Sequence, residues 1–336
     1  MTVAKKDTDN GQKRSSNIFQ HFQLLADKLA PRFSSLIYPA GRWIHRSGKG
    51  LADFGYNQIN DKRLCRLHFF PDSTDIFQDV GIADGLSIVF MDNAKKKEGF
   101  IYVYSKGGKT MEIAMPNPGY TLMALDPMAE QISQKIQAVV GDHFDYISNA
   151  VLSQKLFSIE SDFVEKNPTL VRPYQEGITL GKDEIKLFAN DKAGKAGRTS
   201  WYVAHKSVIK TGLDYLHRWK VVVSSANAGG QKRSNQIAVL DNRSAFGRSR
   251  VALKTFETEQ EARNFYAYCQ TDFIRYAFLL TDEALTSLGK LVPDLLDYTD
   301  DNGIIDYTQD VNAQLYRLFG IDEPMQAIIK QTLSER

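Results

Sequence analysis

The sequence predicts an α/β segment followed by a mixed α+β segment, and three observations support this fold class. First, apolar runs of strand length alternate with helical periodicity between residues 17 and 104, the order typical of an α/β sheet. Second, short β-like runs separated by Gly-, Asn- and Ser-rich loops follow in residues 105–336. Third, 336 residues are enough for two domains with sizeable cores.

The first segment opens with a helix, because apolar residues recur at helical spacing from Ile18 to Leu29 and Pro31 closes the run. A short buried strand is predicted at 36–38, and a second helix at 51–59. The remaining apolar runs predict strands at 63–70, 86–91 and 100–104. These elements define the α/β segment at 17–104.

The second segment begins with two predicted helices, at 128–140 and 147–157. Short strands are then expected at 184–188, 200–203, 219–224, 236–240 and 250–254. A long helix is predicted from Glu259 to Leu280, with Thr255 or Thr258 as its N-cap. A last helix is expected from about Asp310.

Composition excludes several classes of protein. Hydrophobic residues make up 43% and charged residues 24%, which is ordinary for a soluble globular protein. The longest apolar runs, such as 277–280, are too short to cross a bilayer, and the N-terminus has no apolar signal core. Two distant cysteines, Cys65 and Cys269, and histidines without ligand spacing suggest a cytoplasmic protein without a metal site.

Charge is distributed unevenly, although the net charge is only +2. Residues 182–254 hold 15 Lys and Arg against 5 Asp and Glu, a balance of +10. Residues 282–336 hold 4 Lys and Arg against 11 Asp and Glu, a balance of −7. This asymmetry predicts a segment that faces a polyanion beside an acidic, solvated tail; chance segregation of surface charge is the alternative.

One loop concentrates cations, an aromatic ring and glycines. Residues 41–50 follow the predicted strand at 36–38 and carry Arg42, Trp43, His45, Arg46 and Lys49. Loops at the carboxyl ends of strands in open α/β sheets hold ligands, and cations beside aromatic rings suit nucleic acid. The alternatives are a glycine-rich surface loop with solvated charges, an ion pair for Arg42 and core packing for Trp43.

Four sequence strings occur in an order that resembles a known family: IFQHF at 18–22, YPAGRW at 38–43, GKGLADF at 48–54 and DSTDIFQDVGIADGLSIVF at 72–90. They resemble the downstream half of gamma-type adenine-N6 DNA methyltransferases of type II and IIG restriction–modification systems. The chain departs from the family pattern at Gly41, which is an extra residue, at Ser47 and at Gln78. A weaker similarity, at 219–227, 256–264 and 292–294, concerns the family's target-recognition domain.

The resemblance implies a fold and a function. Residues 17–104 would form the end portion of a Rossmann-like methyltransferase sheet, and 105–336 a mixed α+β target-recognition domain with a helical, acidic C-terminal tail. The complete enzyme would transfer methyl from S-adenosylmethionine to adenine in double-stranded DNA. The chain lacks the family's cofactor-binding glycine loop and its Asn/Asp-Pro-Pro-aromatic motif; the nearest string, at 117–120, is interpreted as a turn.

The missing motifs lead to a specific expectation about this chain. No catalytic or cofactor-binding residue is assigned to it, and no cofactor is expected to bind to it alone. We expect the C-terminal portion of a methyltransferase, whose catalytic half is a separate polypeptide or lies upstream of an internal start. The alternatives are a stand-alone DNA-binding or specificity protein without enzymatic activity and a non-functional truncated fragment.

The resemblance and the residue chemistry together give the candidate site residues. Phe77 matches the family's phenylalanine that stacks on the flipped target adenine; a core phenylalanine is the alternative. Arg42, Trp43, Arg46 and Lys49 are candidates for DNA phosphate contacts. Further candidates for DNA contacts in the basic segment are Lys220, Asn227, Lys232, Arg233, Arg248 and Arg250, each with a solvated surface residue as the alternative. The acidic residues at 294–306 are interpreted as a solvated loop rather than a nuclease cluster.

Overall fold

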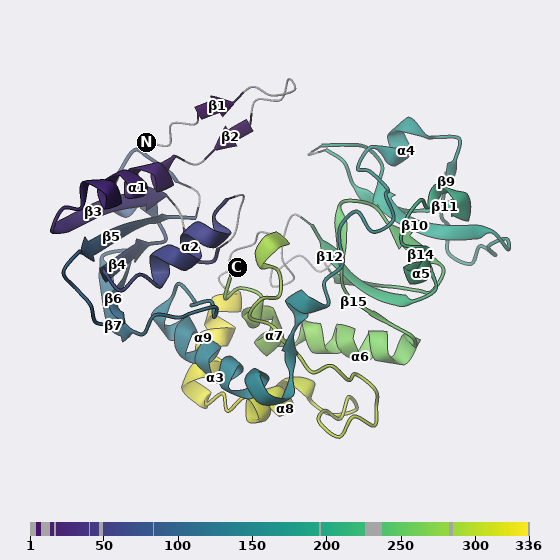
Figure 1. Cartoon of the computed structure of the whole chain (residues 1–336). Coiled ribbons are helices and arrows are strands. Elements are labelled where there is room, and N and C mark those ends of the chain that lie inside the picture. Colours follow the sequence, from purple (N-terminus) through teal and green to yellow (C-terminus); the bar gives the residue numbers. More distant parts are fainter. Residues whose placement is uncertain are drawn as a thin grey trace. The chain divides into compact units, whose positions relative to one another are not determined.

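The chain forms two compact units, Met1–Gln131 and Ile132–Arg336, in the computed structural model (Figure 1). The structure describes residues 5–7, 14–16, 18–39, 41–46, 50–82, 84–194, 196–225, 237–281 and 285–334. Each unit has its own sheets and its own buried apolar cluster. The mixed α/β architecture with several sheets is therefore confirmed.

The first unit is built on a five-stranded sheet with the order β3-β5-β4-β6-β7. Its strands are β3 (Phe33–Pro39), β4 (Leu64–Phe70), β5 (Leu86–Asp92), β6 (Phe100–Lys106) and β7 (Lys109–Met115). Only β4 and β6 pair in parallel; the other neighbours are antiparallel. The other elements of the unit are β1 (Lys5–Asp7), β2 (Arg14–Ser16), α1 (Phe19–Leu29), α2 (Ala52–Ile59) and the 3-10 turn η1 (Ser73–Asp75).

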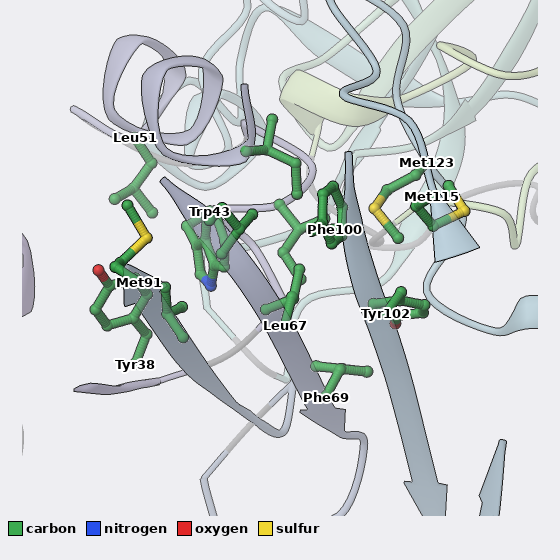
Figure 2. Close-up of a cluster of buried hydrophobic side chains, with 14 of the residues drawn as sticks. Tyr38, Trp43, Leu51, Leu67, Phe69, Met91, Phe100, Tyr102, Met115 and Met123 are labelled. Atoms are coloured by element: carbon green, nitrogen blue, oxygen red, sulfur yellow. The ribbon is translucent and has the colours of Figure 1, made fainter. Parts of the chain in front are cut away.

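One face of this sheet carries the core of the unit. Alternate strand residues such as Leu67, Met91 and Tyr102 are buried there (Figure 2), as the two-residue period of a strand requires. Phe19 of α1 packs edge-on against Phe54 of α2, with ring centroids 5.4 Å apart. The apolar stripes of the two predicted helices therefore meet over the same strands.

A glycine in α2 permits its close approach to the chain that follows β3. A Cβ built on Gly55 would lie 2.0 Å from the carbonyl oxygen of Trp43, far inside the van der Waals limit. Gly55 is therefore required for the helix to pack on the turn at 41–46.

The strand β3 lies at an edge of the sheet, and its outer side has no strand partner within the described residues. The Asn93 amide donates to the Arg32 carbonyl, which directs the backbone of Arg32 toward β5. By alternation, the backbone groups of Phe33, Ser35 and Ile37 point away from β5. The side chains of Phe33 and Ile37 are also exposed, so this edge combines unpaired backbone groups with apolar side chains.

The second unit contains two main sheets that share one apolar cluster. One has the order β14-β10-β11-β9, and the other the order β13-β12-β15. Their strands are β9 (Val171–Pro173), β10 (Glu184–Asn190), β11 (Thr199–His205), β12 (Trp219–Ser224), β13 (Ile237–Leu240), β14 (Ser244–Phe246) and β15 (Arg250–Phe256). A small third sheet pairs β8 (Asp145–Tyr146) with β16 (Pro293–Asp294).

Helices complete the second unit. The longer ones are α3 (Pro127–His143), which begins in the first unit, α6 (Glu259–Gln270), α8 (Val311–Leu318) and α9 (Glu323–Ser334). The shorter ones are α4 (Phe163–Lys166), α5 (Leu213–Leu216), α7 (Asp272–Ala277) and the 3-10 turns η2 (Ile147–Asn149), η3 (Lys206–Val208) and η4 (Leu285–Ser287). Thr258 caps α6 in a reciprocal capping box with Glu261, which confirms one of its two predicted caps.

Several predicted elements differ from the structure. The predicted helix at 147–157 is wrong: only η2 forms, and the Leu152 amide donates to the Ala252 carbonyl instead of continuing a helix. The predicted helix at 259–280 ends at Thr271, whose side chain caps the separate helix α7. The first sheet also continues through β7, past the predicted boundary at residue 104, and the compact units divide after Gln131.

Candidate nucleic-acid interface

The turn at 41–46 buries most of the side chains that sequence reasoning assigned to DNA. Trp43 lies inside the apolar cluster of the first unit (Figure 2). It is 0% exposed, and its Nε1–H donates to Ser87 Oγ at 2.8 Å. His45 is also buried, with its Nε2 3.1 Å from the Met123 carbonyl oxygen. Burial leaves Trp43 no surface for a phosphate, which corrects its predicted DNA contact in favour of the alternative of core packing.

Arg42 is the exposed cation of this turn. Its Nε lies 2.6 Å from Asp84 Oδ2, and the Asp84 carbonyl accepts a hydrogen bond from the Gly41 amide. Asp84 belongs to the connection between β4 and β5, so this pair joins the turn after β3 to the loop after β4. A half-exposed ion pair contributes little stability.

Phe77 lies in the same β4–β5 connection and is 40% exposed, which does not fit the alternative of a core phenylalanine. Ile76 and Val80 are exposed beside it in sequence. The Ser73 hydroxyl donates to the Val80 carbonyl and accepts from the Ile82 amide, both at 2.7 Å. The loop is therefore held in place by its own hydrogen bonds while it presents apolar side chains to solvent.

The carboxyl ends of β3 and β4 lie at the same end of the sheet, because both strands run antiparallel to β5. The structure therefore places Arg42 and the loop of Phe77 at one end, as the position of ligands in open α/β sheets suggested. Arg46 is directed elsewhere: its guanidinium donates to the carbonyls of residues 119–121, and burial lowers its pKa. Its predicted phosphate contact does not fit this arrangement.

Two of the predicted contacts in the basic segment are buried in the second unit. Lys220 is fully buried, and its Nζ donates to the carbonyls of Tyr215, Leu216 and Arg218. The Arg250 guanidinium is mostly buried 4.8 Å from the Phe188 ring centroid. Neither side chain has the exposure that a DNA contact requires, so both predictions are corrected.

Arg248 remains partly exposed, and its Nη1 lies 2.7 Å from Glu160 Oε2. Other cations of residues 182–254 also have carboxylate partners, including the pairs Lys186–Asp241, Lys206–Asp183 and Arg218–Glu257. Lys192 and Arg198 are exposed on the connection between β10 and β11. Both belong to the basic segment 182–254, but neither is among the predicted DNA contacts. The predicted contacts Lys49, Asn227, Lys232 and Arg233 lie outside the described residues.

Lys220 provides a test of structural against DNA-binding roles. Lys220→Ala is expected to destabilise the chain by about 1–3 kcal/mol, because buried carbonyls lose their donors. It should leave the salt dependence of DNA binding unchanged, whereas Arg248→Ala should reduce it with little loss of stability. Urea unfolding and DNA titrations at several salt concentrations measure both. A lower salt slope for Lys220→Ala at unchanged stability would restore its DNA contact.

The pH dependence of Lys220 gives an independent check. Burial lowers the pKa of its ammonium to about 7, although three carbonyl acceptors oppose this shift. Between that value and the ordinary lysine pKa, the unfolded chain binds more protons, so stability should rise with pH. Relative to that of Lys220→Met, the free energy of unfolding of the wild type should rise by at most about 1.4 kcal/mol per pH unit between these two pKa values.

The acidic side chains at 294–306 do not come together in a cluster that could bind a metal ion. Asp294 is buried, and its carboxylate oxygens lie 2.7 and 2.6 Å from Lys254 Nζ. In the described ranges, no group of three His, Cys, Asp or Glu side chains could hold a metal ion. Among the described helices, none has the length and apolar character needed to cross a bilayer.

Comparison with known proteins gives a partial match. A family model described as Eco57I restriction-modification methylase matches residues 2–77. The chain is similar to the type IIL restriction–modification enzyme MmeI in complex with DNA, at 9% identity and a TM-score of 0.41, covering 94% of this chain and 51% of that one. It is also similar to the type IIG restriction endonuclease BpuSI, at 9% identity and a TM-score of 0.34, covering 96% and 49%.

No curated protein matches the chain. The chain spans about half the length of the two solved structures, with 51% and 49% of them covered. The family match over residues 2–77 confirms the coarse part of the predicted resemblance, a similarity to restriction–modification methylases.

Proposed function

We propose that this chain binds DNA and recognises its target as part of a site-specific adenine-N6 DNA methyltransferase of a restriction–modification system. The observation that carries the proposal is the family match over residues 2–77, which includes the basic turn and Phe77. Exposure of Phe77 and Arg42 on two loops at one end of the sheet supports it. A flipped adenine needs an aromatic or apolar surface to replace its lost stacking, and Phe77 offers one.

The catalytic step is assigned to residues outside this chain. The sequence holds neither the Asn/Asp-Pro-Pro-aromatic motif nor the glycine loop for S-adenosylmethionine, so no residue here is proposed to bind the cofactor. In the complete enzyme, S-adenosylmethionine would supply the methyl group. Phe77 would hold the adenine, and Arg42 would contact a phosphate. The proposed partners are double-stranded DNA and a catalytic polypeptide, and the proposed location is the cytoplasm.

The edge of β3, which has no strand partner among the residues that the structure describes, supports a polypeptide partner. Phe33 and Ile37 are exposed there, and the backbone groups of Phe33, Ser35 and Ile37 point away from the sheet. On α1, Phe22, Leu25 and Leu29 form an exposed stripe on the flank roughly opposite Asp27, which pairs with Arg63 at the start of β4. An added strand and an apolar surface would cover both features.

The proposal predicts separate outcomes for binding and catalysis. The chain alone should bind duplex DNA with an affinity that falls as salt rises, and tighter when the target adenine is unpaired. It should transfer no methyl group alone, but should do so with a polypeptide that carries the Asn/Asp-Pro-Pro-aromatic motif and the glycine loop. DNA titrations and transfer of labelled methyl measure the two. Binding without any transfer in the mixture would favour the alternative of a stand-alone specificity protein, and no DNA binding by the chain, with or without that polypeptide, would refute both.

The β3 edge can be tested in the same mixture. Ile37→Lys places a charge at the proposed contact and should reduce reconstituted transfer by about tenfold or more, while DNA binding by the chain alone is retained. Leu170→Lys, at an exposed leucine of the second unit, is the matched control and should have no effect. Equal transfer by both variants would exclude the β3 edge as the contact.

A further inference from the structure

Tyr120 is the most exposed large apolar side chain among the described residues, at 85%, yet its backbone is firmly held. Asn60 at the end of α2 accepts from the Gly119 amide at 2.7 Å and donates to the Gly119 carbonyl at 3.1 Å. Asn117 donates to the Ile59 carbonyl at 2.9 Å and accepts from the Gly99 amide at 2.7 Å. These contacts fix the turn on both sides of Pro118, so the ring is presented by an ordered loop.

Arg46 fixes the same turn from the other side. Its Nη1 donates to the Tyr120 carbonyl at 2.8 Å, and its Nη2 donates to the carbonyls of Gly119 and Thr121. Arg46 also has a backbone φ of 53°, a left-handed conformation that disfavours a residue with a side chain. Such strain persists only where the surrounding structure imposes it, and it is concentrated at functional sites.

The Tyr120 ring has one covered face and one open face. It stacks on Tyr56 of α2, with centroids 4.7 Å apart and planes at 28°. The Arg46 guanidinium carbon lies 5.1 Å from the Tyr56 centroid, within cation–π range. Tyr56 therefore covers one face of the Tyr120 ring, and the 85% exposure of Tyr120 leaves its other face to solvent.

We propose that the open face of Tyr120 is a stacking surface for an unpaired nucleobase of DNA. This inference rests on the proposed DNA-binding function and adds a contact that neither the sequence motifs nor the family match assigns. Stacking on an aromatic ring tolerates every base, and a ring already fixed in place loses little entropy when a base binds. The nearby guanidinium adds positive charge beside a polyanionic ligand.

The test compares three variants of the full chain. Probes are a single-stranded oligonucleotide and a duplex with one unpaired 2-aminopurine, whose fluorescence is quenched by stacking. Tyr120→Ala should weaken binding to both probes by about tenfold and relieve the quenching, whereas Tyr120→Phe should retain both. Leu170→Ala, which removes another exposed apolar side chain, is the control and should match the wild type. Thermal unfolding of Tyr120→Ala should be nearly unchanged, because the ring is exposed.

The outcomes separate this inference from the function on which it rests. If the wild type binds DNA and Tyr120→Ala binds and quenches equally well, the stacking surface is refuted and the proposed function stands. If Tyr120→Ala loses only reconstituted methyl transfer, with DNA binding intact, the ring contacts the partner polypeptide and the inference is again refuted. If the wild type binds no DNA, with or without that polypeptide, both fail.

Discussion

Trp43→Ala is expected to lower the free energy of unfolding by roughly 3–5 kcal/mol, the range for truncating a buried large aromatic side chain. The ring is fully buried among Tyr38, Phe54 and other core residues, and its Nε1–H has a partner in Ser87. Removal leaves a cavity and deprives the Ser87 hydroxyl of its donor. Urea unfolding followed by circular dichroism measures the loss.

Two controls separate packing from DNA contact. Trp43→Phe keeps most of the apolar volume and should cost less than the alanine variant. Arg42→Ala should change stability by less than about 1 kcal/mol, because its ion pair is half exposed, but should weaken DNA binding. A stable Trp43→Ala variant that binds DNA poorly would reverse the assignment of Trp43 to the core.

Asp294→Ala is expected to destabilise the second unit by about 3–5 kcal/mol, because it leaves the mostly buried Lys254 ammonium without its anion. Asp294 also accepts hydrogen bonds from the Tyr298 hydroxyl at 3.0 Å and the Leu296 amide at 3.0 Å. The exposed Asp297→Ala is the matched control and should cost much less. Chemical unfolding monitors both variants.

The double variant Asp294→Ala/Lys254→Met adds a second measurement. It removes both charges and should recover part of the stability lost in Asp294→Ala. If Asp294→Ala proves as stable as the wild type, the pair does not hold β15 and β16 together. The carboxylate would then be free for another role, contrary to its burial.

The periodic elements could be predicted from the sequence, and the irregular ones could not. Strands β4, β5 and β6 and helices α1 and α2 form where apolar spacing places them, and α6 begins where it was predicted to begin. Apolar alternation does not predict β7, because most of its side chains are exposed and it has no buried face. The segment at 147–157 has apolar residues at helical spacing, but its amides find partners in distant segments, such as Val292 and Ala252.

The sequence shows which residue types could contact DNA, but it does not show which of their side chains are exposed. Lys220 stands in a strand with a register shift between Val221 and Val222, so simple alternation does not give its environment. The sequence predicts a turn at 117–120, which explains the backbone of Tyr120 but not the exposure of its ring. No local sequence pattern indicates that Trp43 is buried and Tyr120 is exposed, since the exposure of both side chains depends on how α2 packs.

The close approach of α2 to the turn at 41–46 has a consequence for sequence comparison. Since a Cβ at position 55 would fall 2.0 Å from the Trp43 carbonyl oxygen, every homologous chain that keeps this turn and helix must carry glycine there. We therefore expect a tryptophan followed twelve positions later by a glycine in every such chain.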